Sequence, residues 1–239
     1  AQAMKSPGFL RRLRGRRRDH PGGNGDPGAR ERSALDLADI QGFVLRAYAM
    51  PMLRHFLLTV GDPGHARRQL GRLVNGDESD VPQITAAEDW HVGFAPGPGD
   101  DPASAPRRRS DYCLNIGITW SGLVALEVDE LVPTLSFKAF DAFVEGAAQR
   151  AQLVGDIGPS SPRNWIGGFG SGDDHVLVTL HTLGPDAMTS YSDRLAAWLA
   201  EGDAFREIWR QDGMALMEMQ EGQPVPTSKV HFGYTDGIS

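Results

Sequence analysis

The chain has 239 residues, of which 40% are hydrophobic and 23% are charged, a composition that suits one folded domain with a core of ordinary size. No run approaches the roughly 18 to 20 uninterrupted apolar residues of a membrane span, and a single cysteine, Cys113, excludes an intrachain disulfide. The net charge of −7 is uneven, because residues 1–32 hold nine Lys or Arg against three acids (+6) and the remainder is therefore −13.

Residues 1–34 are predicted to form a disordered basic tail, because they are rich in Arg, Gly and Pro and have no periodic apolar face. The acidic remainder repels nucleic-acid phosphates, which argues against a nucleic-acid partner for the body of the protein. The tail itself is either a solvated arm or a tether to an anionic surface. Its arginines lead into Pro, Gly and Asp rather than an apolar segment, which argues against a secretion signal and favours the cytoplasm.

The first ordered elements are a strand and a helix. The apolar, β-branched run at 54–60 predicts a strand. The run at 62–74 predicts a helix with Asp62 as its cap and Pro63 in its first turn. The apolar side of this helix is expected to carry Ala66, Leu70 and either Leu73 or Val74. From Ile84 to Asp111 the chain is a polar loop with room for one edge strand.

A second strand is predicted at 112–119, where Cys113 is a small buried thiol, and Thr119 then caps a short helix at 120–128. A long helix is expected at 136–156. On its core side we place five positions: Phe137, Phe140, Phe143 or Val144, Ala147 and Ala151. The irregular stretch at 155–174 is a long loop, and such loops are usually functional or mobile.

A third strand is predicted at 175–183, followed by a helix at 186–202 and a final strand at 213–222, where apolar residues alternate. The apolar side of that helix is expected to hold Met188, Tyr191, Leu195 and Trp198 or Leu199. The elements then follow the order βαββαβ. This order predicts an α+β fold, a ferredoxin-like antiparallel sheet with helices on one face and extra inserted helices.

Most candidate chemical motifs fail on their spacing. The glycine-rich run "GGFGSGDD" has Asp173 where a phosphate-binding loop needs its third glycine. His175 and His181 fall on one side of a strand without a carboxylate or thiol beside them, which indicates structural histidines rather than a metal site. Ser160 and Ser161 lack the strand–turn–helix setting of a hydrolase nucleophile.

The terminal run "HFGYTDGIS" is the remaining candidate. Gly233 and Gly237 permit backbone conformations closed to other residues, so that Asp236 can be held on a tight turn with its carboxylate projecting. On composition alone this is a turn. Its context, described next, favours a functional aspartate.

Four segments occur in the order found in dye-decolorizing (DyP-type) haem peroxidases, and the chain resembles that family from about Asp39 to Ser239. They are "DIQGFVL", "LNIGITWSGLVAL", "LVGDIGPSSPRNW" and "HFGYTDGIS". The Gly-x-x-Asp-Gly signature of the family matches Gly233, Asp236 and Gly237. Proteins of this family have two ferredoxin-like domains, with the haem in the second.

The resemblance implies a peroxidase that uses hydrogen peroxide to oxidise dyes or phenolic compounds, with haem b as its cofactor. It implies that Asp236 is the distal acid–base that moves a proton between the two peroxide oxygens, and that Gly233, Asp236 and Gly237 line the cofactor site. The implied organisation is an N-terminal ferredoxin-like domain at 35–228, with 229–239 beginning a truncated haem-binding domain. No Trp or Tyr is assigned as an electron relay.

The chain departs from the family at the iron. In such peroxidases the proximal histidine and the distal arginine follow the aspartate, whereas none of the histidines here matches the proximal position, and His231 lies on the motif's own side of the haem. A metal ligand is therefore expected beyond Ser239, and the chain alone is expected to stay colourless with haemin. The alternative is a haem-free ferredoxin-like module that acts through homo-oligomer or partner contacts at its sheet edges.

Overall fold

The structure is a computed structural model that describes residues 36–45, 47–48, 50–75, 81–90, 111–128, 140–227, 229 and 232–234. Its elements, in chain order, are η1 (Leu37–Asp39), α2 (Gly42–Leu45), β1 (Met52–Val60), α3 (Pro63–Asn75), β2 (Tyr112–Ile118), α4 (Trp120–Ala125), α5 (Asp141–Val154), η4 (Gly158–Ser160), η5 (Pro162–Asn164), β3 (Val176–Thr182), α6 (Pro185–Ala200), η6 (Glu201–Asp203), β4 (Phe205–Met214), β5 (Met217–Gln220) and β6 (Gln223–Pro226). The predicted basic tail at 1–34 lies outside the described residues.

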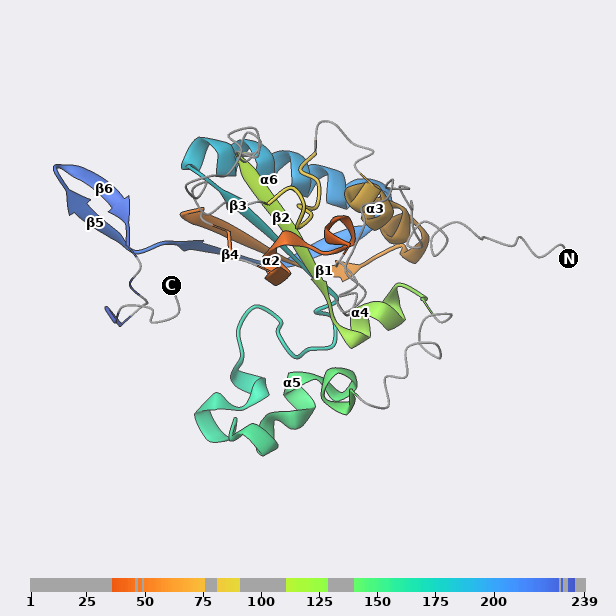
Figure 1. Cartoon of the computed structure of the whole chain (residues 1–239). Helices are drawn as coiled ribbons and strands as arrows, with labels where there is room; N and C mark the ends of the chain where they lie inside the picture. The colour runs from red at the N-terminus through yellow and green to blue at the C-terminus, as the bar shows by residue number, and fades with distance from the viewer. Residues whose placement is uncertain are drawn as a thin grey trace, which may run out of the picture.

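A four-stranded sheet in the order β2-β3-β1-β4 organises the molecule, and all its neighbouring strands run antiparallel. Helix α3 connects β1 to β2 and helix α6 connects β3 to β4, and both helices lie over the same face of the sheet (Figure 1). This is the βαββαβ order with the central strands first and third in sequence. The predicted α+β, ferredoxin-like sheet is confirmed.

The core lies between the sheet and these two helices. Alternate residues of β1 and β3 point into it, as the two-residue period of a strand requires. Fully or nearly fully buried members come from β1, α3, β2, β3 and α6, among them Phe56, Leu58, Leu73, Leu114, Val176, Val178, Leu180, Leu195 and Leu199. Burying each such side chain contributes roughly 1.5–3 kcal/mol, so this layer provides most of the driving force for the fold.

Both predicted helix caps are present. The Asp62 carboxylate accepts a hydrogen bond from the His65 backbone N–H at 2.6 Å, and the Thr119 hydroxyl accepts one from the Gly122 N–H at 3.0 Å. On α3, Leu73 is buried and Val74 is 57% exposed, which decides between the two residues that the helical period allowed. The predicted apolar side of α6 is confirmed: Met188, Leu195, Trp198 and Leu199 are buried, and Tyr191 is half-buried against the core.

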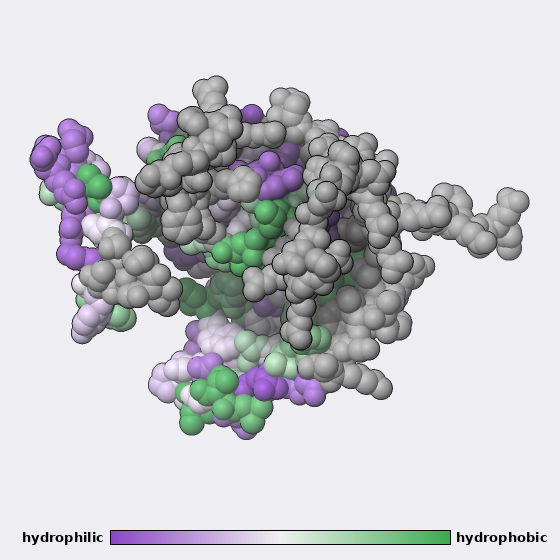
Figure 2. Space-filling view, viewed as in Figure 1, coloured by the Kyte–Doolittle hydropathy of each residue, from purple (hydrophilic) through white to green (hydrophobic). Residues whose placement is uncertain are grey.

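The expectation that the phenylalanines of the long helix are core residues is wrong. Helix α5 begins at Asp141, and Gly146 (φ +74°) interrupts its helical geometry, so a single apolar stripe does not run along it. Phe140 is 62% exposed and Phe143 is 39% exposed, while Ala151 alone is buried. Phe137 lies outside the described residues. Helix α5 lies below the sheet in Figure 1. Together with the loop that follows it, α5 forms a lobe (the α5 lobe) that carries exposed apolar surface (Figure 2).

The final strand was also misplaced by the sequence pattern. The edge strand is β4, Phe205–Met214, and the predicted strand at 213–222 is divided between the end of β4, a break, and β5. Strand β4 escapes detection because it is mostly exposed and charged. In addition, the pairing register with β1 shifts between Leu57 and Leu58, which interrupts the alternation that a regular strand would show.

Side chains close the β2 edge of the sheet. The Gln41 amide group donates to the Ile116 carbonyl at 3.0 Å and accepts from the Ile116 N–H at 2.8 Å. The Thr85 hydroxyl accepts from the Leu114 N–H at 3.1 Å. The edge strand expected after Ile84 is reduced, within residues 81–90, to a single bridge between Gln41 and Ala86. The rest of that loop, 91–110, is not among the described residues.

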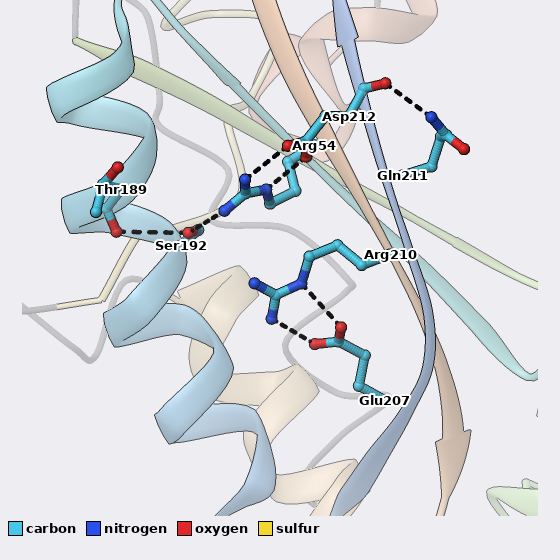
Figure 3. Close-up of polar contacts among 7 residues, drawn as sticks. All are labelled: Arg54, Thr189, Ser192, Glu207, Arg210, Gln211 and Asp212. Atoms are coloured by element: carbon cyan, nitrogen blue, oxygen red, sulfur yellow. Dashed lines mark hydrogen bonds and ion pairs between the residues drawn. The ribbon is translucent and has the colours of Figure 1, made fainter.

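A polar network holds β4 to the rest of the molecule (Figure 3). From β1, Arg54 makes paired hydrogen bonds of 2.6 and 2.7 Å to the Asp212 carboxylate of β4. Its third nitrogen donates to the buried Ser192 hydroxyl of α6 at 2.8 Å. Arg210 pairs with Glu207 along the same strand and lies over the Phe56 ring, 4.9 Å from its centroid. The network therefore joins β4 to β1 and to α6.

Candidate functional site

The described part of the terminal motif is a turn on the surface. Gly233 has φ +80°, and a Cβ placed there meets no atom within 4 Å, so the backbone angle rather than crowding favours glycine. Its neighbours Phe232 and Tyr234 are 81% and 74% exposed. Asp236, Gly237 and His231 lie outside the described residues, so the roles assigned to Asp236 and to both glycines stay predictions.

The motif follows a hairpin that stands away from the body (Figure 1). The Ala215 N–H donates to the Pro51 carbonyl at 2.7 Å, where β4 leaves the sheet, and β5 and β6 then pair with each other. At the hairpin base the Thr227 N–H donates to the Leu216 carbonyl at 2.8 Å, and the Lys229 ammonium pairs with Glu218. These contacts fix where the terminal segment starts.

Four histidines are described, and two of them are held by the fold. In His175, Nδ1 accepts from the Val60 N–H at 2.9 Å and Nε2 lies 3.0 Å from the Gly172 carbonyl, so both ring nitrogens connect the long loop to β1. His65 lies beside Asp62, with 3.3 Å between its Nδ1 and the carboxylate. The expectation of structural histidines fits His175 in full.

His181 and His55 form a second cluster, on the sheet face opposite α3 and α6. His181 is 7% exposed and packs against the Tyr48 ring, with centroids 5.0 Å apart. Burial, and then the charge of His55, lower the pKa of His181 to about 4, and burial lowers the pKa of His55. Among the described residues, Nε2 of His181 has no hydrogen-bond partner. His55 Nδ1 lies 2.9 Å from the hydroxyl of Thr179, its cross-strand partner on β3.

Next to this cluster, the single cysteine is a structural residue. Cys113 is fully buried with Tyr48, Met50 and Trp90. Burial raises the pKa of its thiol to about 12, so the reactive thiolate is disfavoured. The predicted buried thiol is confirmed.

No cluster of metal-ligand side chains lies within the residues described. Within them, no group of three or more His, Cys, Asp or Glu side chains is placed to hold a metal ion. His175 uses both ring nitrogens in the fold, and His181 packs against the rings of Phe43 and Tyr48. None of these contacts identifies an axial ligand to haem iron among the described residues. Nor does any helix in that part have the length and apolarity needed to cross a bilayer.

The long loop forms an open pocket with α5, of about 500 Å³. The loop is built by local hydrogen bonds: the Trp165 indole N–H donates to the Ser160 carbonyl at 2.9 Å, and the Asn164 amide donates to the carbonyls of Gly158 and Pro159. The pocket lining mixes small apolar and polar groups, among them Gln149, Gln152, Asp156, Ser161 and Arg163. The arrangement provides hydrogen-bonding groups but no nucleophile–base pair.

Comparisons with known proteins identify the fold. No family model and no curated protein sequence matches the chain. Solved structures do match: "Crystal structure of DyP" shares 21% of its sequence over 86% of this chain and 38% of that protein, with a TM-score of 0.59. A dye-decolorizing peroxidase in complex with 2,6-dimethoxyphenol is 20% identical over 86% of this chain and 39% of that protein, with a TM-score of 0.58. A decolorizing peroxidase from Auricularia auricula-judae is 19% identical over 86% of this chain and 38% of that protein, with a TM-score of 0.57.

These structures show the fold that the chain shares with part of each peroxidase. The chain spans about two fifths of their length. At 19–21% identity the match shows a shared arrangement of strands and helices, but it does not show which residues are catalytic.

Proposed function

We propose that this chain is part of a haem-dependent peroxidase of the dye-decolorizing type, which uses hydrogen peroxide to oxidise dyes or phenolic compounds. The observation that carries the proposal is the structural match over 86% of the chain to dye-decolorizing peroxidases, one of them solved with a phenol. The terminal Gly-x-x-Asp-Gly motif, found from the sequence independently of that match, supports it. In this proposal residues 229–239 belong to the haem-binding domain, and haem b is held by residues outside the described part.

Asp236 is the residue proposed to act on peroxide. A carboxylate can accept the proton of one peroxide oxygen and return it to the oxygen that leaves, which is general acid–base catalysis by one group. Gly233, with φ +80°, supports the turn on which Asp236 is carried. The proposed partners are hydrogen peroxide and an organic reductant, and the acidic body of the protein gives no reason to add nucleic acid.

The test uses the product of the complete natural reading frame, supplied with haemin, in parallel with the 239-residue chain. We expect a Soret band and peroxide-driven bleaching of an anthraquinone dye from the former. From the chain alone we expect no Soret band, because none of its histidines matches the proximal position of the family. The Asp236→Asn variant should lower the bleaching rate by about 10²–10⁴-fold. Asp186→Asn, in the first turn of α6, is the matched control and should keep the rate.

Two results would count against the proposal. A colourless product of the complete reading frame would remove the peroxidase assignment altogether. A coloured product whose bleaching is unchanged in Asp236→Asn would keep the peroxidase assignment and remove the role of Asp236.

The alternative, a haem-free module that assembles through its sheet edges, has less support. The β2 edge is occupied by Gln41 and Thr85. The opposite edge, β4, carries Arg206, Glu207, Arg210 and Asp212, and charged edge strands resist pairing with another chain.

A further inference from the structure

The β5–β6 hairpin has one face made of methionine and proline. The register pairs Met217 with Pro226 and Met219 with Pro224. Because side chains alternate across a strand, these four residues share a face, while the intervening pairs present Glu218, Gln220, Gln223 and Val225 on the other. Met214, at the end of β4, lies just before this hairpin.

These methionines are more exposed than Met50 and Met188, which are buried, and Met52, which is half-buried. Met214, Met217 and Met219 are 65%, 39% and 69% exposed, whereas Met188 is 4% and Met50 is 9% exposed. The hairpin stands clear of the sheet in Figure 1. Solvent therefore reaches three thioether sulfurs within six residues, and the same chain provides buried methionines for comparison.

The prolines restrict what can bind along the hairpin. Proline has no N–H, so Pro224 and Pro226 occupy positions of β6 whose N–H would otherwise point outward from the pair. An added strand would find no donors there. Strand addition along the outer edge of β6 is therefore disfavoured.

We propose that Met214, Met217 and Met219 form a peroxide-reactive methionine cluster, the site at which hydrogen peroxide first oxidises the described part of this protein. The thioether sulfur attacks one peroxide oxygen, an S–O bond forms as the O–O bond breaks, and the products are methionine sulfoxide and water. Sulfur loses two electrons and peroxide gains them. The oxidant is the co-substrate of the proposed function, but the reaction requires neither haem nor Asp236.

Oxidation changes the chemistry of the hairpin. A sulfoxide is polar, so the methionine–proline face becomes hydrophilic. This happens on the strands that connect β4 to the terminal segment, to which the hairpin is tied by the Thr227–Leu216 hydrogen bond of 2.8 Å and the Lys229–Glu218 ion pair. Methionine sulfoxide reductases restore the thioether, so the change is reversible.

The experiment treats the folded protein, without haemin, with hydrogen peroxide, stops the reaction with catalase, and follows oxygen addition at each methionine by peptide mass spectrometry. Met214 and Met219 should oxidise about tenfold faster than Met188 or more, in line with exposed fractions of 65% and 69% against 4%. In urea the rates should become equal. Equal rates in the folded protein, or faster oxidation of Met188 or Met50, would overturn the proposal.

Variants provide a second measurement. A triple variant, Met214→Leu with Met217→Leu and Met219→Leu, should lose the fast phase of oxidation, whereas Met188→Leu should keep it. Retention of the wild-type protein on a hydrophobic-interaction column should fall after peroxide and recover with methionine sulfoxide reductases. A fast phase that persists in the triple variant contradicts the assignment. Because haemin is absent throughout, these results do not depend on whether the protein is a peroxidase.

Discussion

Replacing Gln41 with alanine tests how the edge of the sheet is closed. Gln41 lies in the "DIQGF" segment and makes hydrogen bonds of 2.8 and 3.0 Å to the backbone of Ile116 on edge strand β2. A hydrogen bond contributes about 0.5–1.5 kcal/mol net, so the pair contributes about 1–3 kcal/mol. Water can reach an edge and replace part of the interaction, so we expect Gln41→Ala to lower the free energy of unfolding by about 1–2 kcal/mol.

The assay is urea-induced unfolding followed by tryptophan fluorescence. The control is Gln149→Ala, at an exposed position of α5, which should change the free energy of unfolding by less than about 0.5 kcal/mol. Gln41→Glu separates donor from acceptor: at neutral pH the carboxylate cannot donate to the Ile116 carbonyl, and on protonation it regains an O–H donor. The stability of Gln41→Glu relative to wild type should therefore improve as the pH falls.

Two observations would refute this reasoning. One is a Gln41→Ala variant within about 0.5 kcal/mol of wild type, which is the usual range for a surface substitution without a structural role. The other is a Gln41→Glu variant whose relative stability does not change with pH. Sedimentation adds a separate readout, because an unprotected edge should make the variant associate at high concentration while the wild type does not.

Three further predictions concern caps, pH and packing. Thr119→Ala should cost about 1 kcal/mol in urea unfolding, or more, since the hydroxyl caps α4 and also donates to the Asp174 carbonyl at 2.7 Å. His181 stays neutral in the fold down to a pKa of about 4 but takes up a proton near pH 6.5 when unfolded, so stability should fall by up to about 3 kcal/mol as the pH drops through that window. His181→Gln should flatten this slope and His65→Gln should not; parallel slopes for wild type and His181→Gln would disprove it. Gly167 has φ +72°, and a Cβ added there would lie 2.7 Å from the Trp209 ring, so Gly167→Ala should loosen the α5 lobe. Proteolysis within the α5 lobe should therefore be faster in Gly167→Ala than in Gly172→Ala, where an added Cβ meets no atom within 4 Å.

The parts of the fold that the sequence predicted are those where local pattern and packing agree. Strands β1 and β3 are apolar because they are central, and α3 and α6 have one buried side each with caps that are visible in the sequence. Strand β4 was missed because an edge strand with a register shift, held by Arg54 and Asp212 rather than by an apolar stripe, has no local signature. That network could be found only from contacts 158 residues apart in sequence.

The α5 phenylalanines illustrate the opposite limitation. A helical spacing of apolar residues was read as a core face, but Gly146 breaks the helix, and Phe140 and Phe143 remain exposed. For the candidate site, glycine at 233 could be foreseen from the turn chemistry of the motif, and the structure gives it the expected left-handed φ. The role of Asp236 rests on the family resemblance, because no local pattern distinguishes a catalytic aspartate from one in an ordinary turn.

The strand order has a consequence for synthesis on the ribosome. Among the described residues, strand β1 pairs with β3, which begins at Val176, and with β4, which begins at Phe205, and both are translated after it. Between Val60 and Val176 the ribosome adds 116 residues (176 − 60), which takes about 6 to 23 s at the usual roughly 5–20 residues per second. During that interval the apolar strand β1 is without these neighbours, so it is a segment that we expect a chaperone to bind as the chain emerges.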